Sequence, residues 1–267
     1  MADGAVLVYL IKMDLRLSLL VSFNFFWLSS ALLAATKTPV LVVSKPYPGH
    51  PTWFSVEVTA DIKNVTFVVR SSDKGASLED LRSPNALVAI NGAYFDPKFA
   101  PIAWLKDSSK EYHKKSRSNR GGVFAIVSDT GYLGSVTKVA FSPDFAVQNF
   151  PLLVQPPGTS AMKGDDGKRA ARTVICAKDA DSNGNTKLIS LIVILSQPSE
   201  GPTLFELAAQ LAKPIDAGGF ACTAALNLDG GPSTGIWLAP EFSSVAKEAR
   251  GPITSIGHAI SLEAKYK

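Results

Sequence analysis

Short apolar runs alternate with turn residues along most of the chain. Runs rich in valine, isoleucine and phenylalanine end at glycine, proline, asparagine or aspartate, which is the pattern of strands joined by turns. Strands are predicted within 39–58, where prolines divide two of them, and within 65–70, 86–96 and 121–136. Because strands follow one another with few helices between them, antiparallel hairpins are expected.

Two stretches predict helices by their capping pattern. The stretch "SLEDLR" (77–82) begins with a capping serine, has an aspartate at its fourth position and stops before a proline. In 203–213, Thr203 and Glu206 predict a second capping box, and leucine and alanine recur on one helical face.

The later part of the chain combines both kinds of element. Two apolar runs flank Asn183-Gly184, a dipeptide that favours a tight hairpin turn. The order strand 187–196, helix 203–213 and strand 221–228 also allows a βαβ unit, with a right-handed crossover if the strands are parallel. The pattern as a whole predicts an α+β fold, with largely antiparallel or mixed β-sheets and a few flanking helices, in a single domain.

The N-terminal segment reads as a targeting signal. Lys12 and Arg16 precede a long apolar run that ends in small residues near position 35, which is typical of a secretory signal peptide. The run is also close to the length that spans a bilayer, so an uncleaved anchor is the alternative. Either way, the rest of the chain is expected to be exported, as a secreted or periplasmic protein.

Composition and charge narrow the function classes. The 267-residue chain is 46% hydrophobic, enough to bury a sizeable core. Its formal net charge of +4 equals the excess of six basic over two acidic residues within 106–120, which would attract an anionic partner. That segment lacks the interleaved aromatic residues of a nucleic-acid site, so no nucleic acid is expected. Cys176 and Cys222 lie in the predicted exported part, as one disulfide or as two buried thiols.

Polar residues and glycines gather where three predicted strands end or begin. They are Asn91, Gly92, Tyr94 and Asp96 after one strand, Arg169 and Arg172 before a second, and Asn227, Asp229, Gly230, Gly231 and Ser233 after a third. Glycine backbones and arginine forks bind phosphate, and a pair of carboxylates can act at an anomeric carbon. Asparagine side chains can orient sugar hydroxyls or a water. Each motif alone is equally typical of an ordinary turn.

Together these motifs resemble a known family. "INGAYFD", "RTVIC" and "ALNLDGGPSTGIW", in this order, resemble the phosphodiester glycosidase family over about residues 85–262, and "FPLLVQ" and the helix at 203–213 are similar too. The chain departs from the family at positions where glycine is usual, which here carry Ala93, Phe150, Cys176 and Pro232.

The resemblance implies an exported glycoside hydrolase. It would cleave a sugar-1-phosphodiester, such as one of N-acetylglucosamine, to free sugar and a phosphomonoester, in exopolysaccharide or cell-wall glycans. Arg172, with Arg120 or Arg169, would bind the phosphate and stabilise its charge. Asp229 and Asp96 are the candidate acid, base or nucleophile. The sugar-phosphate or glycan-phosphate substrate is the expected partner, and a membrane is expected only if the N-terminal segment stays uncleaved.

The expected organisation follows from these assignments. Residues 1–35 would form the signal peptide or anchor, and 36–84 the N-terminal strands and proline-rich loop. Residues 85–267 would form the catalytic region of the same domain.

Two other functions use the same residues. Ser233 lies in a G-x-S-x-G match, followed by Glu241 or Glu248 and then His258, in the order of a serine esterase. That motif needs a strand directly before the serine and a helix directly after it, whereas glycines and a proline precede Ser233 and an apolar stretch follows it. A secreted glycan-binding module without turnover is the second alternative.

No cofactor is expected to be required. His50, His113 and His258 are widely separated, and the chain has no zinc-type pair of histidines. Aspartate oxygens leave open a divalent cation such as calcium.

Overall fold

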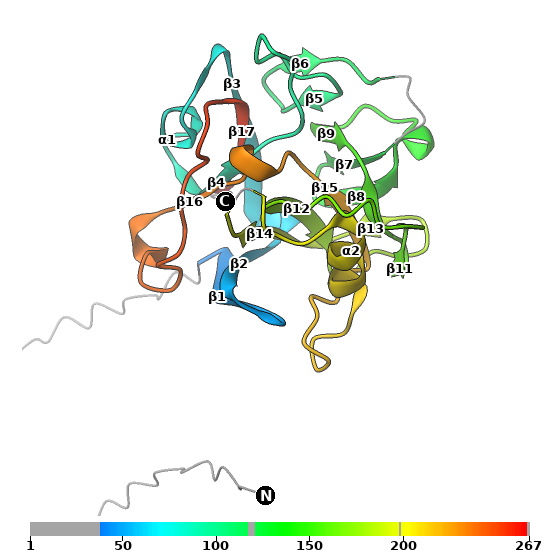
Figure 1. Cartoon of the computed structure of the whole chain (residues 1–267). Coiled ribbons are helices and arrows are strands. Elements are labelled where there is room, and N and C mark those ends of the chain that lie inside the picture. The colour runs from blue at the N-terminus through cyan, green and yellow to red at the C-terminus, as the bar shows by residue number, and fades with distance from the viewer. Residues whose placement is uncertain (1–37, 117–120, 198, 266–267) are drawn as a thin grey trace, which may run out of the picture. The chain divides into compact units, whose positions relative to one another are not determined.

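Three β-sheets make up most of the regular secondary structure in the computed structural model, which describes residues 38–116, 121–197 and 199–265 (Figure 1). The predicted signal segment and Arg120 lie outside these residues. Residues 38–267 cluster as one unit. Among the described residues, no helix is both long and apolar enough to cross a membrane.

The three sheets have defined strand orders. The seven-stranded sheet contains, in spatial order, β1 (Val40–Tyr47), β2 (His50–Asp61), β14 (Leu188–Leu195), β12 (Arg172–Ala177), β15 (Ala224–Asn227), β10 (Leu152–Gln155) and β11 (Thr159–Ser160). The six-stranded sheet contains β13 (Asn185–Thr186), β8 (Thr130–Ser135), β7 (Gly122–Val127), β9 (Phe145–Asn149), β5 (Leu105–Lys106) and β6 (Glu111–His113). The four-stranded sheet contains β16 (Ile236–Leu238), β4 (Ala86–Asn91), β17 (Ile256–Ala264) and β3 (Val65–Ala76).

Neighbouring strands in the described part of the chain all pair antiparallel, which confirms the prediction of largely antiparallel sheets. The helical part is smaller than an α+β fold suggests. The α-helices of the described residues are α1 (Leu78–Leu81) and α2 (Leu204–Ala212). Single 3₁₀ turns occupy Ile62–Asn64, Val136–Lys138, Gly231–Ser233 and Pro240–Phe242. The fold is therefore mainly β.

The seven-stranded sheet is buried on both faces. On one face, Ile175 and Leu191 join a core that also contains side chains from the other two sheets. On the other face, Val174 and Ile192 pack with Leu207 of α2, which lies against this sheet in Figure 1. Double burial explains why β12 and β14 are continuous apolar runs rather than alternating ones.

Helix α2 begins as its sequence predicts. The Thr203 side chain accepts a hydrogen bond from the backbone N–H of Glu206, and the Glu206 carboxylate accepts one from the backbone N–H of Thr203. The helix connects β14 to β15, and both strands are antiparallel to β12 between them. The two strands are therefore parallel to each other, as the predicted βαβ order requires, but one strand apart.

The predicted hairpin at Asn183-Gly184 is only partly right. β12 and β14 do pair antiparallel, but residues 178–187 connect them, instead of a two-residue turn. The Asp181 carboxylate accepts hydrogen bonds from the backbone N–H groups of Asn183 and Asn185, which closes a small turn of its own. β13 follows that turn and pairs with β8 of another sheet, so tertiary pairing lengthens the connection.

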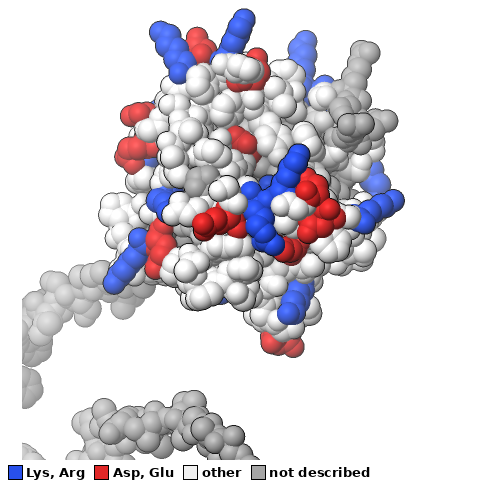
Figure 2. Space-filling model, viewed as in Figure 1, with Lys and Arg blue, Asp and Glu red and all other residues white. Residues whose placement is uncertain are grey.

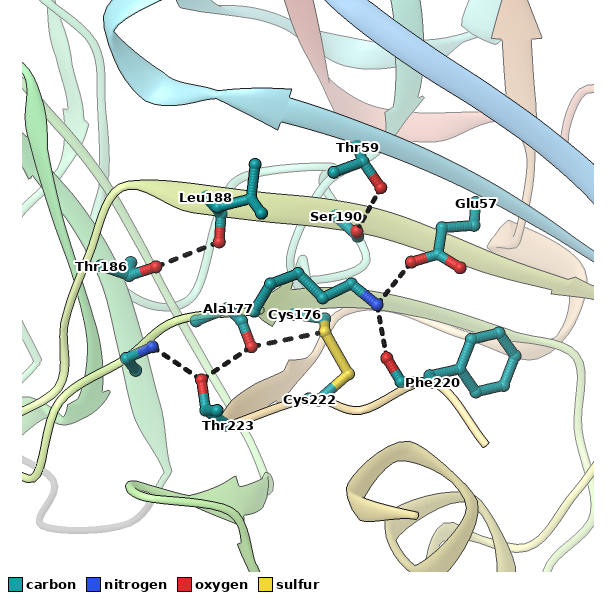
Figure 3. Close-up of a disulfide and its surroundings, with 12 residues drawn as sticks. Glu57, Thr59, Cys176, Ala177, Thr186, Leu188, Ser190, Phe220, Cys222 and Thr223 are labelled. Atoms are coloured by element: carbon teal, nitrogen blue, oxygen red, sulfur yellow. Dashed lines mark hydrogen bonds and ion pairs between the residues drawn. A yellow bond between two sulfur atoms is a disulfide. The ribbon is translucent and has the colours of Figure 1, made fainter. Parts of the chain in front are cut away.

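The two cysteines form a disulfide, which decides between the alternatives left by the sequence (Figure 3). Cys176 of β12 is bonded to Cys222, with their Cα atoms 5.5 Å apart. Beside it, Lys178 forms an ion pair with Glu57 at 2.6 Å and donates a hydrogen bond to the Phe220 carbonyl. The bond fixes the segment after α2 to the sheet, directly before β15.

Charges are mixed over the face shown in Figure 2, where basic and acidic side chains lie close together. Acidic and basic residues are also mixed in the described part of the basic segment, residues 106–116. Its Asp107 is buried and accepts hydrogen bonds from the backbone N–H groups of Val69, Ser109 and Lys110. This acidic residue is therefore a structural part of the loop.

Candidate active site

The three predicted segments meet where β4 and β15 end and β12 begins. Asn91, the last residue of β4, forms hydrogen bonds with the other two segments. Its Oδ1 accepts hydrogen bonds from the Thr173 hydroxyl at 2.7 Å and the Gly235 N–H at 3.1 Å. Its Nδ2 donates to the Asp229 carbonyl at 2.9 Å. Both atoms of the amide thus hold the site together, and a direct contact with substrate would have to replace one of these bonds.

Glycines let the backbones of this site come close together. The Gly92 carbonyl accepts a hydrogen bond from the Asp229 N–H at 3.1 Å, and a Cβ on Gly92 would overlap the His258 ring. Gly231 has a φ of +60°, in the region that favours glycine, and its N–H donates to the Ala171 carbonyl at 2.8 Å. The Asp229 loop is therefore fixed to both neighbouring strands.

Asp229 is the titratable group at the centre of this loop. Its Oδ1 accepts a hydrogen bond from the Gly230 N–H at 2.9 Å, and the Ser233 hydroxyl also donates to it. Burial raises the pKa of the Asp229 carboxyl above its usual value, and the two hydrogen bonds offset only part of this effect. A partly desolvated carboxylate with a raised pKa is suited to acid–base or nucleophilic chemistry.

Arg172, at the start of β12, is the cation beside the same loop. It is 7% exposed, and it donates hydrogen bonds from Nε to the Pro202 carbonyl at 3.1 Å and from Nη2 to the Lys168 carbonyl at 2.7 Å. Burial lowers the pKa of Arg172, but an arginine remains charged at neutral pH. Nη1 makes no hydrogen bond within the described residues and lies next to Gly230, so it can bind an anion.

Tyr94 and Asn227 complete the site. The Asn227 Nδ2 donates to the Tyr94 hydroxyl at 3.1 Å and to the Phe150 carbonyl at 3.2 Å. Burial and then the nearby charge of Asp229 raise the pKa of Tyr94, while Arg172 lowers it, so Tyr94 lies near both charged groups. The buried Oδ1 of Asn227 has no hydrogen-bond partner among the described residues.

Two other predicted residues are engaged elsewhere. The Asp96 Oδ1 accepts hydrogen bonds from the backbone N–H groups of Lys98 and Ala100, at 2.8 and 3.0 Å, and so closes its own loop. Arg169 forms an exposed ion pair with Glu206 at 2.6 Å. Arg120, the third candidate arginine, lies outside the described residues.

Sequence reasoning missed three residues that support the site. Thr173 donates to Asn91, as above. The Asn149 side chain accepts from the Tyr94 N–H at 3.3 Å and donates to the Asn227 carbonyl at 2.8 Å. The ring of Phe150 packs on that of Tyr94, with 5.1 Å between centroids. Their position at a strand end, as for Asn91 and Asn227, was the signal that could have found Asn149 and Phe150.

The serine esterase arrangement does not form. Ser233 lies in a 3₁₀ turn that is followed by strand β16, not by a helix. His258 is 1% exposed, and neither ring nitrogen has a hydrogen-bond partner of ordinary geometry in the described chain. The Ser233 hydroxyl is hydrogen-bonded to Asp229 instead. In the described ranges, no three histidine, cysteine or acidic side chains are grouped to hold a metal ion.

One cavity adjoins the candidate site, and a larger one lies apart from it. A cavity of about 530 Å³, lined by residues that include Ser196, Glu200 and Arg250, contains none of the residues predicted for the phosphodiester site. A smaller cavity of about 250 Å³ is lined in part by Tyr94, Asn149 and Phe150. The smaller cavity is therefore the one that adjoins the candidate site.

The chain is a mainly antiparallel β protein. Where its strand ends meet, it has a partly buried aspartate, a buried arginine and a glycine-rich turn. Residues 84–260 match the model of the phosphodiester glycosidase family, so the chain belongs to that family. The resemblance of its three motifs is thereby confirmed. No curated protein matches the chain.

Two solved structures share the fold. One is the zebrafish N-acetylglucosamine-1-phosphodiester alpha-N-acetylglucosaminidase catalytic domain, auto-inhibited by its pro-peptide. It is 16% identical with a TM-score of 0.57, over 85% of this chain and 82% of that one. The other is a hypothetical protein from Synechocystis, 14% identical with a TM-score of 0.52, over 80% of this chain and 59% of that one.

Proposed function

We propose that the protein is an exported hydrolase that cleaves sugar-1-phosphodiesters, such as those of N-acetylglucosamine, at the glycosidic bond. One observation carries the proposal. Asp229, whose pKa is raised by burial, directly precedes Gly230, and the buried guanidinium of Arg172 lies beside the same glycine. Both charges also act on Tyr94, so a reactive carboxylate and an anion site lie close to one side chain.

In the proposed reaction the bond between the anomeric carbon and the phosphate oxygen breaks. The electron pair of that bond leaves with the phosphate, and Arg172 stabilises the departing phosphomonoester. Asp229 acts at the anomeric carbon, either by removing a proton from the attacking water or as the nucleophile of a covalent intermediate. The water oxygen ends on the sugar, and the products are free sugar and phosphomonoester.

A phosphate leaving group explains why one carboxylate serves at this site. It departs as a stabilised anion, so it needs less protonation than an alcohol leaving group would. Asp96 is accordingly assigned to closing its loop, where two backbone N–H groups bind it. Arg172 is preferred to Arg169, because Glu206 already neutralises Arg169.

We place the reaction outside the cytoplasm, on exopolysaccharide or cell-wall glycans. The apolar segment near the N-terminus has the sequence of an export signal. The disulfide between Cys176 and Cys222 supports this placement, because such bonds persist in oxidising compartments.

The test is hydrolysis of the methyl phosphodiester of N-acetylglucosamine by the purified protein. We expect Asp229→Asn to lower kcat by about a hundredfold to ten-thousandfold, because it removes the reacting carboxylate. Arg172→Ala should lower kcat/KM by about a hundredfold or more. Arg172→Lys, which keeps the charge but not the planar fork, serves as the matched variant, and circular dichroism checks that each variant folds.

Ser233→Ala separates this mechanism from that of a serine esterase. The Ser233 hydroxyl lowers the pKa of Asp229, so its removal raises that pKa and moves the acid limb of the activity profile to higher pH. An esterase would instead lose its nucleophile and its activity. Binding of the diester without turnover by the wild type would contradict the enzyme proposal and favour a glycan-binding module.

A further inference from the structure

The cavity beside Tyr94 has a character different from that of the reaction centre. It has a volume of about 250 Å³ and is lined by Tyr94, Ile102, Ala103, Gln148, Asn149 and Phe150, together with Ser116. At about 30 Å³ per water molecule, it has room for about eight waters, or a single ring with its attachment.

Apolar side chains form the accessible wall of this cavity. Phe150 is 51% exposed and Ile102 is 48% exposed, although both are large hydrophobic residues. The Phe150 ring lies 5.1 Å from the Tyr94 ring, tilted by 57°, so the two rings form one aromatic surface. Exposed apolar surface gathered in a concave site is typical of ligand binding.

The polar groups of the cavity are largely used by the protein itself. The Gln148 Oε1 accepts a hydrogen bond from the Ser116 N–H at 3.0 Å. The Asn149 side chain binds the Tyr94 N–H and the Asn227 carbonyl. A sugar ring needs partners for its hydroxyls, so this cavity suits a sugar poorly.

Tyr94 also lies near the groups that a sugar phosphate needs. These are the guanidinium of Arg172 and the carboxylate of Asp229, whose charges both act on Tyr94. Because Asn227 donates hydrogen bonds to both the Tyr94 hydroxyl and the Phe150 carbonyl, the reaction centre and the cavity are adjacent. A diester with its sugar and phosphate near Asp229 would extend its second ester group toward Phe150.

We propose that this cavity is the aglycone subsite and that it binds an apolar, ring-sized group esterified to the phosphate. The inference rests on the proposed function and narrows its substrates to those whose phosphate carries such a group. Phe150 is the specificity-determining residue. Its ring, together with that of Tyr94, forms the aromatic wall of the cavity.

The test compares diesters of N-acetylglucosamine-1-phosphate that differ only in the second ester group: methyl, benzyl and hexosyl. The wild type should have a kcat/KM for the benzyl diester about ten to a hundred times that for the methyl diester, with the hexosyl diester below the benzyl one. Phe150→Ala and Ile102→Ala should each lower the benzyl-to-methyl ratio by about fivefold or more.

Ile215→Ala is the matched control. Ile215 is 67% exposed and does not line the cavity, so the ratio should stay at the wild-type value. The inference is overturned if the wild type shows no benzyl preference, if it prefers the hexosyl diester, or if both cavity variants keep the wild-type ratio. Should Phe150→Ala fail to fold, Ile102→Ala decides.

A binding measurement separates the subsite from the enzyme proposal. If no diester is hydrolysed, the proposed function fails, and calorimetry with benzyl phosphate and methyl phosphate still tests the cavity. Tighter binding of benzyl phosphate to the wild type, with the difference reduced in Phe150→Ala or Ile102→Ala, supports the apolar subsite. Equal binding of the two phosphates overturns it.

Discussion

At the residue scale, the Asp229 carboxylate links the proposed reaction to the stability of the fold. Its pKa is raised by burial above the usual 3.8. The folded protein therefore binds this proton more tightly than the unfolded chain does. The resulting stabilisation is present below the unfolded pKa and is lost as the pH rises through the folded pKa.

Asp229→Asn should therefore raise Tm at neutral pH while it removes activity. The neutral amide avoids the cost of a desolvated charge and can still accept the hydrogen bond from the Gly230 N–H. Thermal unfolding at pH 7 and at pH 3.5 tests this, with the gain expected only at pH 7. A variant less stable than the wild type at pH 7 would contradict the account.

The same carboxylate predicts the acid limb of the activity profile. The ionised form is the active one in either proposed role, so activity should fall as the pH falls through the raised pKa of Asp229.

His258 gives a second pH dependence with the opposite sign. Burial lowers its pKa from 6.5 to about 4, and the Ala93 backbone offsets only a small part of this. The unfolded chain therefore takes up the proton first, and stability falls as the pH drops from 6.5 toward 4. Between pH 7 and pH 5 we expect His258 to contribute a loss of about 2 kcal/mol in the free energy of unfolding, which proton uptake by Asp229 opposes.

Urea unfolding of His258→Leu beside the wild type measures this loss. The variant should show a smaller change between the two pH values, whatever its absolute stability. His113→Gln, which alters an exposed histidine, is the control and should follow the wild type. Equal pH dependence in the wild type and His258→Leu would show that His258 is not the group responsible.

The sequence predicts which strand ends come together better than it predicts what each side chain binds there. Asn227, Asp229 and Arg172 lie at predicted strand ends, and the structure brings these ends together. A substrate contact by Asn91 stays a prediction, and in the structure both its amide atoms join strands. The hydrogen-bond partners of the Asn91 amide, Thr173 and Asp229, are more than 80 positions away in the sequence, so local spacing could not reveal them.

At the element scale, α2 shows how local signals fix an element. Thr203→Ala removes the capping hydrogen bond to the Glu206 N–H and should lower the free energy of unfolding by about 1 kcal/mol. Thr254→Ala, at an exposed loop threonine, is the matched control and should have little effect. Equal losses in the two variants would argue against a capping role.

Elements whose limits depend on distant pairing were predicted less well. β3 extends to Ala76, beyond the predicted 65–70, because β17 pairs along its length. Asn183-Gly184 forms a turn, but the residues that follow pair with β8, so the connection between β12 and β14 is longer than a two-residue turn. Capping and periodicity act within a few residues, whereas these limits are set by partners elsewhere in the chain.

At the scale of the whole molecule, one core joins strands from all three sheets. The disulfide adds a covalent link across this architecture, between cysteines 46 residues apart. It restricts the unfolded chain, so its loss should lower the free energy of unfolding by about 3–4 kcal/mol.

Urea unfolding with and without dithiothreitol tests this contribution. Cys176→Ala combined with Cys222→Ala is the matched variant and should be insensitive to the reductant. A wild type whose midpoint does not change on full reduction would contradict a stabilising role for the bond.

The central claim is that the glycosidic bond, not a bond to phosphorus, is broken at Asp229 and Arg172. Hydrolysis of the methyl diester of N-acetylglucosamine-1-phosphate in ¹⁸O-labelled water, read by mass spectrometry, tests it most directly. Because the water attacks the anomeric carbon, the account predicts ¹⁸O in the released sugar and unlabelled methyl phosphate. Label in the phosphate product would show cleavage at phosphorus and contradict the account.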